Sequence, residues 1–356
     1  MKFRDYDLVL ITDEKQRLYF TGFHSSAGYF MLNKRKKYFV VDKRYFYAAY
    51  KRLTPKGYEV LCASDFSYLV DCVEYLGVKT LGIDFSKTNM AQFALIKKLL
   101  PNTCYKDIGS ELNEEMAVKY PEELNVISKA CRIAEKSFKQ ILKSLKEGVT
   151  EKDIAAELEY LFKKNGASDK SFDPIIAFGP NSAVPHHESG KTRLKYNTPV
   201  LMDFGCIYEG YCSDMTRTLW FGDQPTEDFL KAYDAVYDAH IAVFDNVVPG
   251  MNGGEADAIA RKILTKRGYG EQFTHSLGHG IGVNIHEYPW LAPNRDCLLL
   301  DGMVFSDEPG VYFNGKFGIR IEDTICLENG KAKTFMEDDK KLIIVNNGKI
   351  KKYLNK

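Results

Sequence analysis

The stretch that decides the fold is a strand–turn–strand segment, PVLMDFGCIYEGYCSDMTRTLW, at residues 199–220. A two-residue Glu-Gly turn in its middle sets the register, so Asp203 is expected to lie opposite Thr216. Asp214 lies two residues before Thr216 on the same face, so the two carboxylates are diagonal neighbours with Cα atoms roughly 7–8 Å apart. Carboxylates that converge on an apolar sheet repel each other unless a cation neutralises them. This hairpin alone allows two interpretations, a cation site or a half-exposed hairpin with two solvated aspartates.

A second acidic hairpin, MVFSDEPGVYFNGKFGIRIED at residues 303–323, favours a cation site. A two-residue Asn-Gly loop would place Glu308 and Glu322 on opposite faces of the hairpin, whereas a three-residue loop with a glycine bulge sets them opposite each other on one face. We expect the three-residue loop, because the Pro-Gly that follows Glu308 already disturbs the ladder. Asp307 would then point away from the site.

The histidines gather near these strands. Five of the seven fall in two segments rich in glycine and proline, and these are His186, His187, His275, His279 and His286. His275 and His279 are four residues apart, but Ser276 follows His275 and glycines crowd the segment, so a loop or strand edge is expected and not the helical HExxH zinc motif. A lone histidine is more often structural, but five of them beside four strand carboxylates are unusual in a core. His240 is expected to be an ordinary residue of a helix.

The composition is that of an ordinary globular protein, with 45% hydrophobic and 27% charged residues among 356. Lys and Arg number 49 against 48 Asp and Glu, so the net charge of +1 favours neither nucleic acid nor an anionic membrane as a partner. No run approaches the ~20 apolar residues of a membrane-spanning helix, and no signal peptide is expected. The eight cysteines are scattered without a CxxC pair, which indicates reduced thiols and a cytoplasmic protein.

A change of texture near residues 110–120 predicts two domains, residues 1–115 and 116–356. The first alternates short apolar runs, such as 8–12 and 79–83, with helical patterns, so we expect an α/β domain.

The second domain is expected to be an internally duplicated α+β unit. Helical patterns at 121–146 and 150–165 recur 102 positions later at 226–247 and 255–267, and strand-rich segments follow each pair. Gly148 and Gly250 occupy equivalent positions between the helices of the two pairs. The lysine-rich end, 349–356, is expected to be a solvated tail.

Taken together, these motifs resemble the pita-bread metallopeptidases, specifically the Xaa-Pro branch of aminopeptidase P and prolidase. The resemblance covers nearly the whole chain, and its motifs are Pro-His at 185–186, the aspartate pair eleven residues apart, Gly-His-Gly-Ile-Gly at 278–282, His-Glu at 286–287, Glu-Pro-Gly at 308–310 and Arg-Ile-Glu-Asp at 320–323. Segments 19–23 and 42–45 also look like the smaller N-terminal domain of these enzymes. The resemblance implies a creatinase-like N-terminal domain and a pita-bread catalytic domain with internal pseudo-symmetry.

The resemblance also implies two divalent metal ions. The implied ligands are Asp203, Asp214, His279, Glu308 and Glu322. Asp203 would chelate one ion, Asp214 and Glu322 would bridge both, and His279 and Glu308 would complete the shell of the other. An oxygen-dominated shell with a single imidazole favours Mn²⁺, with Co²⁺, Zn²⁺ and Fe²⁺ as alternatives. Ser306 and Asp307 stand where the family usually has Thr and an apolar residue, and the extra carboxylate leaves the identity of the ion open.

The implied reaction is hydrolysis of the bond between an N-terminal residue and a following proline, by a hydroxide that bridges the metals. The residues expected to act on the substrate are His186, His275, His286, Glu308 and Arg320. Glu308 would handle the proton, the histidines would position the proline side and stabilise the tetrahedral intermediate, and Arg320 would hold Glu322 or the substrate.

An aminopeptidase that acts on peptides of three or more residues is our first expectation. A prolidase restricted to dipeptides and a non-catalytic peptide-binding module on the same fold are the alternatives. The expected partners are peptides with proline at the second position and a second copy of the chain in a homodimer.

Overall fold

The computed structural model describes residues 3, 5–338, 340–346 and 348–352. The chain divides into two compact units, Met1–Met116 and Ala117–Lys356. None of the helices in the described part of the chain is long and apolar enough to cross a bilayer.

The first unit is built on a mixed sheet. Its strands are β1 (Leu8–Ile11), β2 (Tyr29–Leu32), β3 (Lys37–Val41), β4 (Tyr58–Cys62), β5 (Thr80–Ile83) and β6 (Cys104–Asp107). Its helices are α1 (Glu14–Thr21), α2 (Lys43–Leu53), α3 (Ser67–Leu76), α4 (Met90–Leu99) and α5 (Gly109–Ala117). The strand order is β4-β3-β2-β1-β5-β6, and hydrophobic clusters on both faces account for the nearly continuous apolar character of β1 and β2.

Two pairs of helices frame the second unit. They are α6 (Pro121–Ile141) with α7 (Glu151–Lys164), and α8 (Glu227–Asn246) with α9 (Gly253–Lys266). Capping boxes begin α7 and α9, and both Gly148 and Gly250 adopt φ +88°, a left-handed conformation in which a side chain is strained. The two halves therefore use the same turn at the same place. Helix α6 ends at Ile141, earlier than the expected 146, because the chain tightens into a 3₁₀ turn over Leu142–Ser144.

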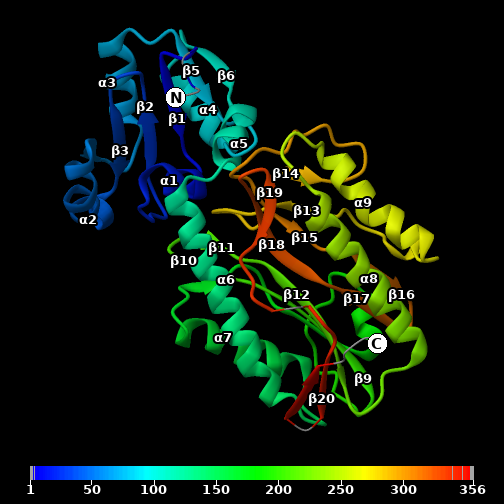
Figure 1. The fold of residues 1–356 in the computed structure, drawn as a ribbon. Coiled ribbons are helices and arrows are strands. Elements are labelled where there is room, and N and C mark those ends of the chain that lie inside the picture. Colours follow the sequence, from blue (N-terminus) through cyan, green and yellow to red (C-terminus); the bar gives the residue numbers. More distant parts are fainter. Residues whose placement is uncertain (1–2, 4, 339, 347, 353–356) are drawn as a thin grey trace. The chain divides into compact units, whose positions relative to one another are not determined.

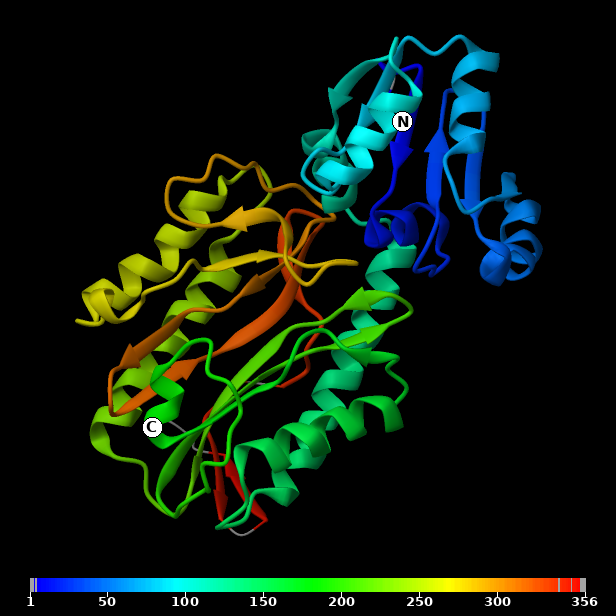
Figure 2. The same cartoon turned by 180° about the vertical axis from the view of Figure 1, so that it is seen from behind.

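A large curved sheet lies between the two helix pairs. The strands of this unit are β7 (Asp169–Lys170), β8 (Ile175–Phe178), β9 (Thr198–Phe204), β10 (Cys206–Tyr208), β11 (Tyr211–Cys212), β12 (Met215–Phe221), β13 (Gly278–Gly280), β14 (Glu287–Leu291), β15 (Val304–Asp307), β16 (Gly310–Phe313), β17 (Phe317–Arg320), β18 (Glu322–Glu328), β19 (Lys331–Thr334), β20 (Ile343–Asn346) and β21 (Lys349–Lys352). Among the described residues ten of them form one sheet, in which β12 pairs with β9, β18 and β20. Figures 1 and 2 show α6 and α7 along one side of this sheet, and α8 and α9 along the other.

Each helix pair covers its own hydrophobic core. Phe138 of α6 and Phe162 of α7 pack against Phe204 of β9, while Phe229 of α8 packs against Trp220 of β12. The expectation of a solvated tail is wrong for residues 349–352, which form β21 and pair with β20. Residues 353–356 lie outside the described residues.

Strand register places the acidic residues. Thr216 of β12 pairs with Asp203 of β9 on one side and with Glu322 of β18 on the other, so the three residues lie abreast on adjacent strands. The register expected for the first hairpin is therefore confirmed. In the second hairpin Phe313 pairs with Phe317, which leaves the expected three-residue loop.

Candidate functional site

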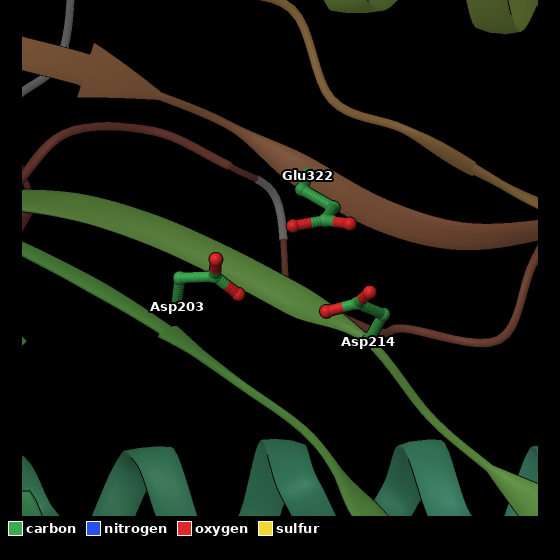
Figure 3. A group of neighbouring side chains, drawn as sticks. All are labelled: Asp203, Asp214 and Glu322. Atoms are coloured by element: carbon green, nitrogen blue, oxygen red, sulfur yellow. The ribbon is translucent and has the colours of Figure 1, made fainter. Parts of the chain in front are cut away.

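Three carboxylates from separate segments meet at the centre of the second unit. Asp203 comes from β9, Asp214 from the residue before β12 and Glu322 from the start of β18. A carboxylate oxygen of each lies within 4.8 Å of an oxygen of the other two, and Figure 3 shows the side chains pointing toward one another. All three residues are buried, and Oδ1 of Asp203 and Oδ1 of Asp214 have no hydrogen-bond partner in the described part of the chain. Buried carboxylate oxygens without partners indicate that a cation belongs between them.

His279 and Glu308 adjoin this cluster. The Nε2 atom of His279 lies 3.4 Å from Oε1 of Glu308 and 3.8 Å from Oδ2 of Asp214. Nδ1 of His279 faces the Gly280 carbonyl at 3.1 Å. A carbonyl only accepts, so Nδ1 carries the proton and the lone pair of Nε2 is directed at the carboxylates. Burial, reinforced by His286, lowers the pKa of His279 to about 3, so the imidazole is neutral and suited to bind a metal.

Arg320 supplies a positive charge next to Asp203. Its Nη2 atom donates to Oδ2 of Asp203 at 2.5 Å, and its Nε atom donates to Oγ1 of Thr216 at 3.0 Å. Thr216 in turn donates to Oε2 of Glu322 at 2.6 Å. We expected Arg320 to hold Glu322 or the substrate. In the structure it holds Asp203 directly and reaches Glu322 only through Thr216.

The cluster carries more negative charge than its protein partners neutralise. Burial first, and then the neighbouring carboxylates, raise the pKa values of Asp214 and Glu322 well above their ordinary values. Burial also raises the pKa of Glu308, although Arg320 opposes this. Four carboxylates with a neutral imidazole form an oxygen-rich donor set, which fits hard or borderline divalent cations.

The other predicted histidines line a cavity of about 470 Å³, and the four carboxylates and His279 line the same cavity. His186 and His286 are exposed there, and the His286 ring lies edge-on to His279 with the ring centroids 4.1 Å apart. His275 is fixed at both nitrogens, because Nδ1 faces the Ser276 carbonyl at 2.8 Å and Nε2 lies 2.9 Å from the Tyr312 hydroxyl. Burial, followed by the charge of Arg320, lowers the pKa of His275 to about 4.

Two residues noted in the sequence face away from the cavity. His187 turns back and contacts Glu151 at the start of α7. Asp307 points to the opposite face of the sheet, as expected, where Oδ2 lies 3.0 Å from Nδ1 of His240. His240 belongs to helix α8, but its buried contact with a carboxylate means that it is not an ordinary core residue. The unusual Asp307 therefore cannot enter the shell of a metal bound among the four carboxylates.

Comparison with known proteins shows the family to which this chain belongs. Residues 125–329 match metallopeptidase family M24. The chain belongs to this family. Residues 1–118 match the creatinase/prolidase N-terminal domain.

Several M24 relatives cover most of the chain. An Xaa-Pro dipeptidase of Pyrococcus horikoshii is 37% identical over 267 residues, which are 75% of this chain and 76% of that protein. Among solved structures, an Xaa-Pro dipeptidase from Bacillus anthracis has a TM-score of 0.91 at 34% identity and covers 96% of both chains. An X-Pro aminopeptidase from Thermotoga maritima has a TM-score of 0.90 at 30% identity, covering 96% of this chain and 98% of the other. These matches confirm the expected pita-bread fold and the expected creatinase-like N-terminal domain, and they identify the chain as a peptidase.

Three polar residues at this candidate site were not predicted as site residues. Thr216 links Arg320 to Glu322, and the strand pairing predicted for it was the signal that could have identified it. The hydroxyl of Ser306 donates to Glu308 at 2.9 Å and accepts from the backbone N–H of His279 at 3.0 Å. The Tyr312 hydroxyl accepts from Arg320 at 2.7 Å and so can donate to His275, and nothing in the local sequence signals this link.

Proposed function

We propose that the chain is an Xaa-Pro aminopeptidase, which removes the residue preceding a proline at the second position of a peptide. The observation that carries this proposal is the convergence of four carboxylates and one neutral imidazole in a cavity that is also lined by three further histidines. The aminopeptidase and dipeptidase names of the relatives support the Xaa-Pro bond as the target. In this proposal, residues 116–356 form the catalytic domain and residues 1–115 the N-terminal domain.

The proposal includes two divalent cations, with Mn²⁺ preferred over Co²⁺, Zn²⁺ and Fe²⁺ because oxygen dominates the donor set. Asp203 would hold one ion, Asp214 and Glu322 would hold both, and His279 with Glu308 would complete the other set. Bound there, the cations supply Lewis-acid activation of water and polarisation of the scissile carbonyl.

The protein groups have distinct tasks in this reaction. Glu308 accepts the proton of the attacking water and passes it to the leaving nitrogen of proline. His186 and His286 face the cavity and can donate to the carbonyl oxygens on the proline side. His275 is bound by Tyr312, and Tyr312 by Arg320, so this chain of contacts orients the site before substrate arrives. Because proline has no N–H, the cavity can select it by the shape of its ring.

Dipeptidase activity is the second candidate, and Arg295 favours it. This exposed residue lines the same cavity, so its guanidinium can pair with the free carboxylate of a dipeptide. The test is hydrolysis of Ala-Pro and Ala-Pro-Ala by the metal-loaded protein. Cleavage of the tripeptide supports the aminopeptidase, whereas cleavage of Ala-Pro alone, with its KM raised by Arg295→Gln, establishes the dipeptidase.

A non-catalytic binding module on this fold gives a different outcome. It would hold less than one metal ion per chain by elemental analysis and cleave neither peptide after addition of Mn²⁺. The cytoplasmic location stays a prediction from the sequence, and the homodimer stays a prediction from the family resemblance.

A further inference from the structure

A buried carboxylate outside the proposed set of metal ligands holds the loop that carries His186. Glu151 is the first residue of α7 and is 0% exposed. Its Oε1 atom accepts hydrogen bonds from the Phe178 backbone N–H at 2.9 Å and from Nδ2 of Asn181 at 2.8 Å. Its Oε2 atom accepts from the Gly190 backbone N–H at 3.0 Å and lies 2.9 Å from Nε2 of His187.

These four donors satisfy the hydrogen-bonding needs of the buried, negatively charged Glu151 carboxylate. A carboxylate can only accept, so His187 is in the tautomer or charge state that carries hydrogen on Nε2. Hydrogen bonds to an ionised acceptor are shorter and stronger than neutral ones, and the N-terminal end of a helix favours negative charge. Glu151 is therefore a fully satisfied anion that fixes whatever donates to it.

The donors come from both ends of one segment. Phe178 ends β8, Asn181 lies in the 3₁₀ turn that follows, and Gly190 closes the segment twelve residues after Phe178. The backbone of α7 adds a further bond at the same place, because the Lys152 N–H donates to the Gly190 carbonyl at 3.0 Å. Both ends of the segment are thus tied to the start of one helix.

His186 lies on this segment next to His187. The two side chains diverge, since His187 reaches Glu151 while His186 lines the cavity. A turn closed by the His187 N–H and the Val184 carbonyl, at 3.1 Å, fixes the backbone between them. We propose that Glu151 is a positioning residue for the peptidase reaction, acting through His187 and the 178–190 segment to set where His186 meets the substrate. This inference rests on the proposed function.

The other half of the duplicated unit contains a comparable arrangement. Asp257 of α9 is buried and accepts from the Leu277 backbone N–H at 3.0 Å. It also binds Arg261, whose Nη2 atom donates to the His275 carbonyl at 3.0 Å. In each half, then, a carboxylate near the start of the second helix holds a loop that carries a cavity histidine.

The test is Glu151→Gln in the full chain. Glutamine has the same shape, but its amide nitrogen cannot accept, so two of the four donors lose their partner in either orientation. Hydrogen–deuterium exchange of the metal-free protein should become faster in residues 176–192 and remain unchanged in residues 273–277. Unchanged exchange in 176–192 would overturn the proposal whether or not the protein is active.

Kinetics decide whether the loop matters for catalysis. With metal bound, Glu151→Gln should lower kcat/KM by about 10- to 100-fold, mostly in kcat, with metal content unchanged. In a His186→Ala background the same substitution should have almost no further effect. An equal loss in both backgrounds would show a general structural effect and overturn the proposal. Glu157→Gln, an exposed change on the same helix, is the matched control and should retain wild-type activity.

A milder pair of variants covers the case in which Glu151→Gln fails to fold. His187→Ala removes one donor of four and should lower kcat several-fold, while His187→Gln, which keeps a donor near the Nε2 position, should restore it. Equal activity of the two variants would contradict a role for the His187 contact. An inactive wild type would refute the proposed function itself, and with it the role of Glu151 in positioning His186 for the reaction.

Discussion

Asp214→Asn should have opposite effects on stability with and without metal. In the metal-free protein, the carboxylate of Asp214 faces two others whose oxygens lie within 4.8 Å. Two unit charges at that distance repel by about 3 kcal/mol at an effective dielectric constant of about 20. Asparagine removes this repulsion, and because Oδ1 of Asp214 has no hydrogen-bond partner among the described residues, it gives up little in exchange. We therefore expect the variant to be more stable by about 1–3 kcal/mol at pH 8.

The pH dependence follows from the raised pKa of Asp214, which burial causes and Glu322 reinforces. Between the ordinary pKa and the raised one, the folded protein binds more protons than the unfolded chain, so Asp214 destabilises the fold increasingly as the pH rises. The advantage of Asp214→Asn should therefore be largest at pH 8 and vanish near pH 4. With Mn²⁺ at 1,000 times Kd the order should invert, because binding adds about 4.1 kcal/mol to a protein that keeps Asp214, the proposed bridging ligand, and this exceeds the advantage of the variant.

Urea denaturation measures both effects. Both tryptophans, Trp220 and Trp290, lie in the second unit, so their fluorescence reports the unfolding of that unit. Asp173→Asn makes the same charge change at a cavity residue whose side chain is 91% exposed, and it should shift the free energy of unfolding by less than about 0.5 kcal/mol. A metal-free Asp214→Asn protein less stable than metal-free wild type would refute the electrostatic reasoning. Equal stabilisation of both by Mn²⁺ would refute the assignment of Asp214 as a ligand.

Three further predictions concern neighbouring residues. Asp323→Asn should destabilise the protein by about 3–5 kcal/mol at pH 7, because Arg217 and Lys340 outweigh the effect of burial and lower the pKa of Asp323 to about 2. This loss of unfolding free energy should shrink as the pH falls from about 4 to 2, because protonation of Asp323 removes the same ion pairs from the wild type. A loss that urea denaturation finds to be independent of pH would contradict this prediction. His186→Ala should lower kcat while elemental analysis finds wild-type metal content, and loss of metal would show that the residue is a ligand. Thr216→Val should cost about 1–3 kcal/mol in urea denaturation, because Arg320 and Glu322 each lose a buried partner, whereas Thr216→Ser should retain most of the stability.

The register of each acidic hairpin could be predicted because short loops determine it. The tight turn of 199–220 places Asp203 opposite Thr216, and the Pro-Gly after Glu308 favoured the three-residue loop that the structure contains. Periodicity and capping likewise predicted α6 to α9, because amphipathic spacing and helix start signals are local. Helix α1 was not predicted, since its buried face includes Gln16 and Arg17, which bind groups elsewhere in the unit.

The sequence by itself thus determined which residues share a hairpin face, because that depends on neighbours joined by a few residues of turn. Only the tertiary structure decided which hairpins meet. Three features of the site depend on contacts between residues that are far apart in the sequence. Thr216 pairs with Glu322, and Arg320 points toward Asp203. His187 turns away from His186 because it contacts Glu151. Such contacts form when helices and sheets pack against one another. The packing energy that selects them depends on both segments together, so the sequence of one segment alone does not predict them.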